Sequence, residues 1–152
     1  MPSNMNTLCD TLRESIDTLT LDWVARVKAD PYLKSDNPLS ITQLVDHVPE
    51  MLEELCDLLG HEGELDFKDI RASSEHGYAR SLEGYSVTEL LRELELLRGC
   101  VFDFVAETEI KRDVSRPETI RALRVVNEYF SEDIIFVVEH YLQKKADTKG
   151  RF

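Results

Sequence analysis

The sequence predicts an all-α domain of about five helices, with a long helix at the C-terminal end. First, apolar residues recur at spacings of three and four over most of the chain, and strict alternation is nearly absent. Second, the 152 residues include only 6 glycines and 5 prolines, so helices can run far without a breaker. Third, the capping pattern of a serine followed three residues later by glutamate or glutamine occurs three times ahead of an apolar run.

The first expected helix runs from about Thr7 to Ala29. Asp30-Pro31 ends it, because the residue before a proline avoids the α region. A single apolar face joins residues three or four positions apart, namely Leu8, Leu12, Ile16, Leu19, Trp23 and Val27.

A second helix begins at the capping box formed by Ser40 and Gln43, and Gly60 ends it. Pro49 lies inside this segment, where it removes a backbone hydrogen bond, so we expect a kink or a split near His47–Val48. The apolar face consists of Leu44, Val48, Met51, Leu52, Leu55, Leu58 and Leu59.

Two further helices are expected in the middle of the chain. Asp66 caps a more polar one that ends near Leu82, and Ser86 with Glu89 caps the next, which ends near Glu107. The buried candidates of the polar helix are Phe67, Ile70, Ala72 and Tyr78. Those of the next helix are Leu90, Leu94, Leu97, Val101 and Phe104.

The last helix starts at the capping box of Ser115 and Glu118, with Pro117 in the tolerant first turn, and runs to about Lys144. It is apolar on more than one face, so it needs two packing partners: the core of its own chain and a second subunit. We therefore predict a parallel homodimer through the face that carries Phe130, Ile134, Val137 and Tyr141. Val126, Ile135, Val138 and Leu142 lie elsewhere on this helix.

Length and composition predict one domain over residues 1–143, followed by a polar and basic segment, 144–152, that is a flexible tail or a linker. The net charge of −12 argues against binding to nucleic acids or anionic membrane surfaces, which require basic residues. The sequence has no secretory signal and no apolar run long enough to span a membrane, so we expect a cytoplasmic protein with three free cysteines.

The sequence contains no metal-ligand spacing, no glycine-rich phosphate loop and no nucleophile with a recognisable base, so we expect no enzyme activity, no metal and no cofactor.

The unusual stretch of the sequence is the one around His76 and Arg80, which lie four residues apart and therefore on one helical face, with Tyr85 nearby. These three residues form a candidate site for an anionic ligand. Alternatively, Arg80 holds an acidic side chain and His76 is a packing residue. An anion that raises the melting temperature of the wild type but not of Arg80→Ala would favour the ligand site.

The same stretch carries a family resemblance, which extends over roughly residues 10–142. Its motifs are His76-Gly77-x-x-Arg80, the run from Gly84 to Arg98, Trp23-x-x-Arg26-Val27-x-x-Asp30-Pro31, and the run from Leu44 to Leu52. In this order they resemble the RsbR/RsbRD-type N-terminal sensor domain of stressosome proteins and bacterial histidine kinases. The resemblance implies a globin-like, non-haem, dimeric fold ahead of a signalling output domain. No such output domain follows in this sequence, so we expect residues 144–152 to be a tail or a linker to an absent output domain, in either an excised or a stand-alone sensor domain.

We therefore interpret the chain as a non-catalytic sensory or regulatory input domain that relays a signal through a dimeric C-terminal helix to an output domain or partner protein. Two alternatives from other classes stay open. One is a globin-like sensor that binds haem or another small cofactor through His76, which the colour of the purified protein would reveal. The other is a histidine phosphotransfer protein, which phosphotransfer from a kinase would reveal.

Overall fold

The predicted fold class is confirmed: in a computed structural model, the described residues form five α-helices and no strand. The structure describes residues 4–33, 47–61, 66, 68, 70 and 87–149. The side chains of these residues are described from Thr7 to Gln143. The helices are α1 (Asn4–Glu14), α2 (Ile16–Ala29), α4 (Val48–Leu59), α6 (Val87–Lys111) and α7 (Arg116–Lys149).

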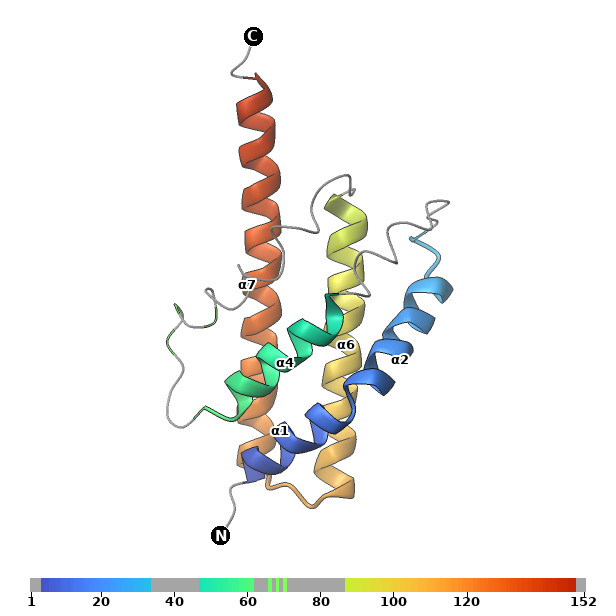
Figure 1. Ribbon diagram of the computed structural model, residues 1–152, viewed down its shortest axis with the longest axis vertical. Helices are drawn as coiled ribbons and strands as arrows, with labels where there is room; N and C mark the ends of the chain where they lie inside the picture. Colours follow the sequence, from blue (N-terminus) through green and yellow to red (C-terminus); the bar gives the residue numbers. More distant parts are fainter. Residues whose placement is uncertain are drawn as a thin grey trace.

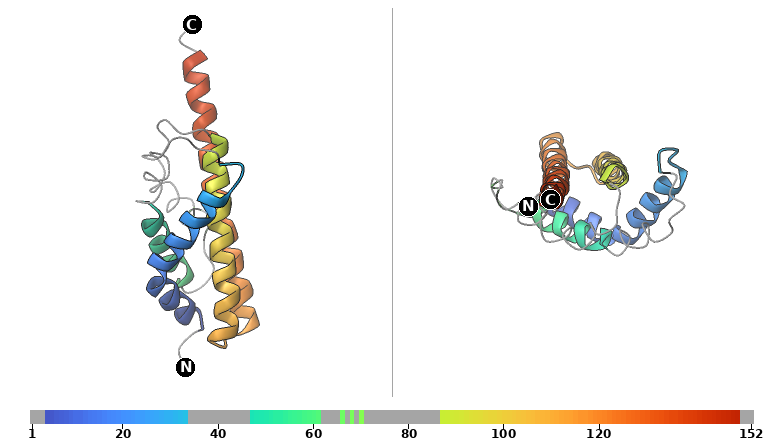
Figure 2. Two further views of the ribbon diagram at one scale, coloured as in Figure 1. Left: turned by 90° about the vertical axis from the view of Figure 1, so that its right-hand side faces the viewer. Right: turned by 90° about the horizontal axis from the view of Figure 1, so that it is seen from above.

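The two longest helices, α6 and α7, form an antiparallel hairpin, and α1, α2 and α4 lie across one face of it (Figures 1 and 2). Helix α7 continues past the end of this packed layer toward the C-terminus (Figure 1). The hairpin therefore has an inner face that is covered by three helices and an outer face that they do not cover (Figure 2).

The core lies between the two layers and uses the predicted apolar faces. All six apolar residues of the first segment are buried, as are the members of the second face from Val48 to Leu59. Leu90, Leu94, Leu97 and Val101 of α6 are also buried, whereas Phe104 is partly covered. The three free cysteines, Cys9, Cys56 and Cys100, are buried.

The first segment is divided into two helices at Ser15, where one continuous helix was expected. The amide of Ser15 donates to the carbonyl of Leu12 at 3.0 Å, which is the tighter spacing of a turn, and Leu19 donates to Ser15 at 2.9 Å to begin α2. The division lets α1 pack on α4 while α2 packs along α6, which a straight helix of this length could not do.

Helix α4 begins at Val48, the point where a split was predicted, so Pro49 lies in the first turn and its missing amide breaks no helical bond. Gly60 caps the C-terminal end of α4, as expected. The capping box at Ser40 lies outside the described residues, and so does most of the polar helix after Asp66. Within its described part, Asp66 accepts a hydrogen bond from the amide of Lys68 at 3.2 Å, and Ile70 is buried as predicted.

A short turn joins α6 to α7. Asp113 has a positive φ of 54°, and the amide of Val114 reaches back to the carbonyl of Glu109 at 3.1 Å, which closes the end of α6. The predicted cap at Ser115 is present, because its hydroxyl accepts from the amide of Glu118 at 3.4 Å. Helix α7 runs to Lys149, beyond the expected end near Lys144, since no glycine or proline interrupts it.

Candidate functional site

The contact between α2 and α6, here called the α2–α6 seam, brings together residues that are far apart in the sequence. It combines an apolar interior with ion pairs along its edge. Its polar members are Trp23, Arg26, Asp30, Arg92, Glu93 and Asp103.

Trp23, the single tryptophan of the chain, forms the interior of the seam. Its side chain has 0% exposure, and its indole Nε1–H donates to the backbone carbonyl of Glu93 at 2.9 Å. Helical periodicity places Trp23 on the apolar face of α2, and its N–H needs a partner when it is buried. This hydrogen bond therefore fixes the position of α2 against one turn of α6.

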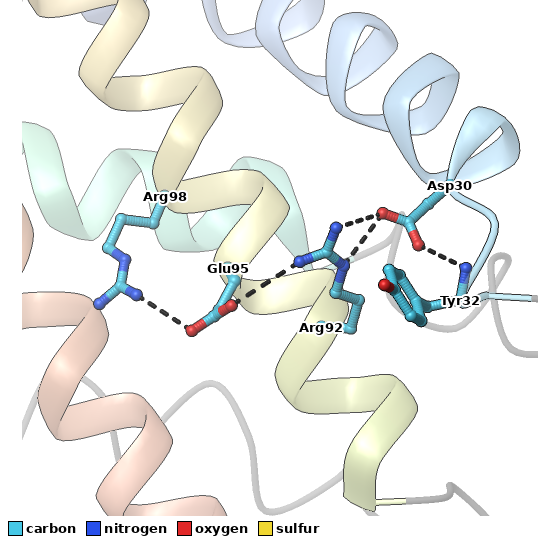
Figure 3. A network of polar contacts seen from close by, with 5 residues as sticks. All are labelled: Asp30, Tyr32, Arg92, Glu95 and Arg98. Atoms are coloured by element: carbon cyan, nitrogen blue, oxygen red, sulfur yellow. Dashed lines mark hydrogen bonds and ion pairs between the residues drawn. The ribbon is translucent and has the colours of Figure 1, made fainter.

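Asp30 and Arg92 close the end of the seam next to the start of α6. Arg92 donates from Nε and Nη2 to one carboxylate oxygen of Asp30, at 3.0 and 2.7 Å, while the amide of Tyr32 donates to the other oxygen at 2.9 Å (Figure 3). The Arg92 guanidinium lowers the pKa of the Asp30 carboxyl below its ordinary value. Arg92 also lies 5.3 Å from the ring centre of Tyr32, a cation–π distance.

A second set of ion pairs follows the edge of the seam. Arg26 donates to Asp103 at 2.9 Å and lies 3.3 Å from Asp22 on its own helix. A Cβ at Gly99 would lie 3.7 Å from the Arg26 guanidinium, an ordinary contact distance, so Arg26 packs closely over α6 at this position. These side chains are partly exposed, so the ion pairs set the register of the two helices more than they stabilise the fold.

The carboxyl group of Glu93 faces the interior. Its residue has 2% exposure, and within the described part of the chain its Oε2 has no hydrogen-bond partner. Burial, together with the negative charge of Glu89 one turn earlier, raises the pKa of Glu93 to about 7. The seam therefore contains a carboxyl group that gains or loses a proton near neutral pH.

The outer face of the α6–α7 hairpin has a different character. A shallow groove between the two helices is lined by Phe102, Asp103, Ala106, Ile120, Leu123, Arg124 and Asn127. Farther along α7, Ile135, Tyr141 and Leu142 are exposed. Large apolar side chains therefore continue along α7 from the groove to its projecting end.

The four residues of the predicted dimer interface divide between the two faces. Phe130 and Val137 have 1% exposure and belong to the core of the single chain. Ile134 is partly buried at the core's edge, and Tyr141 is exposed. The interface through Ile134 and Tyr141 stays a prediction, and the contributions of Phe130 and Val137 are to the chain's own packing.

The predicted ligand residues His76, Arg80 and Tyr85 lie outside the described residues, so their role stays a prediction. The described residues contain no group of three or more potential metal ligands. Within the same part of the chain, none of the helices combines the length and apolar character needed to cross a bilayer.

Two features of the seam were not predicted from the sequence. The Asp30–Arg92 pair joins positions 62 apart, and no local pattern indicates it. The burial of Glu93 could have been predicted, because Glu93 lies three residues after Leu90 and four before Leu97, on the apolar face of its helix.

The described part of the chain thus forms a helical domain in which polar contacts join α2 to α6. Its family model is the RsbT co-antagonist protein rsbRD N-terminal domain, which matches residues 17–151. The chain belongs to this family, a family of regulatory N-terminal domains, and the resemblance in the sequence motifs is thereby confirmed. Neither the curated proteins nor the solved structures include a significant match to the chain.

Proposed function

We propose that the chain is a non-catalytic sensory input domain that forms a homodimer and relays its signal through α7 to an output domain or partner protein. The observation that carries this proposal is the double role of α7. Phe130 and Val137 pack into the core, whereas Tyr141 and Leu142 project from the same helix into solvent. A change in core packing therefore acts directly on the exposed end of α7.

The family name supplies the regulatory context of the proposal. A co-antagonist acts together with other proteins, so we expect the output to pass to a partner protein and not to a reaction catalysed by this domain. Transmission of this kind requires two packing arrangements of similar free energy, with a ligand or partner that favours one of them. The seam between α2 and α6 is a suitable place for such a change, because its interior hydrogen bond and the ion pair at its end meet at one turn of α6.

The outer face of the hairpin supplies a surface for the second subunit. Dimers with two-fold symmetry use the same patch on both chains, so a patch must complement itself. The groove at Phe102 and Leu123 is apolar, and its flanking Asp103 and Arg124 carry opposite charges that can pair across a two-fold axis. We propose that this groove and the exposed apolar residues of α7 form one continuous dimer interface.

The experiment compares Ile134→Glu with the wild type by light scattering over a range of concentrations. A charge at Ile134 would be buried without a partner in the dimer, so the variant should be monomeric while the wild type is dimeric. Gln143→Glu is the matched control, because it adds the same charge to α7 at an exposed position one residue beyond Leu142 and should leave the dimer intact. A monomeric wild type, or an Ile134→Glu variant that still dimerises with unchanged affinity, would reject the interface.

A further inference from the structure

We propose that Glu93, whose buried carboxyl lies at the turn of α6 that binds Trp23, is a proton-binding switch, and that loss of its proton loosens the α2–α6 seam. This inference rests on the proposed sensory function, since it names a signal that the domain can detect.

The position of Glu93 couples its charge to the seam. Its backbone carbonyl accepts the indole N–H of Trp23 at 2.9 Å, and the preceding residue, Arg92, holds Asp30 at 2.7 Å. One turn of α6 thus carries the interior hydrogen bond of the seam and the ion pair at its end. Any displacement of this turn changes both contacts.

The surroundings of Glu93 favour the protonated side chain. On its own helix, Glu89 adds a like charge, and the Arg92 guanidinium is engaged by Asp30 and lies 4.0 Å from Glu95. On α2 the facing group is the uncharged Trp23 indole, and on α7 the buried charged residues are the acidic Glu132 and Asp133. Among the described residues, only Glu89 acts on the Glu93 carboxyl as a charge, so no described cation balances its negative form.

Ionisation of Glu93 therefore destabilises the closed packing of the seam. A buried carboxylate without a counter-ion is unstable unless it reaches water or a hydrogen-bond donor. Because its Oε2 has no hydrogen-bond donor among the described residues, entry of water or a movement of this turn away from α2 would stabilise the charged side chain. Burial and the Glu89 charge together raise the pKa to about 7, so a change of pH around neutrality would change the charge of Glu93.

The fluorescence of the single tryptophan measures this coupling in the intact chain. Trp23 should change its emission in a sigmoidal transition centred near pH 7, because water reaching the seam shifts emission to longer wavelength. Glu93→Gln cannot ionise and should remove the transition. Glu89→Gln removes the like charge and should move the midpoint to lower pH. Glu107→Gln, on the exposed surface of the same helix, is the control and should leave the curve unchanged.

A wild-type curve without a transition near neutral pH, or a transition that persists in Glu93→Gln, would overturn the proposal. If Glu93→Gln does not fold, infrared difference spectra of the wild type give the answer, because a buried protonated carboxyl has a distinct carbonyl band. That band should disappear over the same pH range as the fluorescence change, and its absence at low pH would also overturn the proposal. Light scattering of the same samples separates the two hypotheses: a monomeric wild type that titrates as expected rejects the dimer and leaves the switch standing.

Discussion

At the level of single residues, the acidic groups Asp30 and Glu93 of the α2–α6 seam have opposite surroundings. Asp30 is ionised at neutral pH and is held by the Arg92 guanidinium and the Tyr32 amide. Glu93 lies in the interior without a described hydrogen-bond partner for Oε2, and its pKa is raised to about 7. Groups of the second kind reduce stability when they are charged, and they are retained in proteins where a change of charge has a use.

The residue-scale prediction concerns the pH dependence of stability. Glu93 has a pKa of about 7 in the folded chain and 4.5 as its ordinary value, so its contribution to stability is complete below pH 4.5 and is lost as the pH rises to 7. The wild type should therefore lose about 3 kcal/mol relative to Glu93→Gln over this range. Urea unfolding at several pH values measures the difference, and two curves that stay parallel would show that Glu93 is not buried as described.

At the level of helices, sequence periodicity was sufficient where one face of a helix is buried. It identified the apolar faces of the first segment, α4 and α6, and the separate capping pattern of Ser115 and Glu118 identified the start of α7. It did not identify the division at Ser15, because that bend depends on α1 and α2 packing against different partners. The Asp30–Arg92 ion pair was not predicted for the same reason, since only the packing of α2 on α6 brings the two residues together.

The element-scale prediction concerns the turn between α6 and α7. Asp113 adopts a φ of 54°, which costs a residue with a Cβ about 1 kcal/mol and costs glycine nothing. The greater freedom of glycine in the unfolded chain offsets about 0.5–1 kcal/mol of this gain, so Asp113→Gly should raise the free energy of unfolding by at most about 0.5 kcal/mol. Asp113→Ala is the control and should not stabilise, because alanine keeps the Cβ. Thermal unfolding measures both variants, and a destabilised Asp113→Gly would refute this account of the turn.

At the scale of the whole molecule, the apolar pattern of the C-terminal helix predicted that it has two packing partners but not which residues contact each of them. Its excess of apolar residues indicated two packing partners, and the structure shows that it packs on the core and carries exposed apolar residues. The pattern could not tell which residues face inward, because apolar positions extend around most of the helix and the covered side depends on where the other helices pack. Phe130 and Val137 were assigned to the dimer interface and lie in the core, whereas Leu142 was placed elsewhere and is 58% exposed.

The last prediction tests whether the two copies of α7 run parallel, which relay to a common output requires. In a parallel symmetric dimer, position 142 of one chain faces position 142 of the other, so Leu142→Cys should form a disulfide-linked dimer under mild oxidation. The native thiols are buried and should not react, and Gln143→Cys, turned about 100° around the helix, should cross-link less.

In an antiparallel dimer, position 142 instead approaches the beginning of the partner's helix. Positions 120 and 142 are separated by about 33 Å along α7, so one chain with Ile120→Cys and one with Leu142→Cys would then cross-link while Leu142→Cys alone would not. Gel electrophoresis without reductant distinguishes the two results, and the second would contradict the parallel relay.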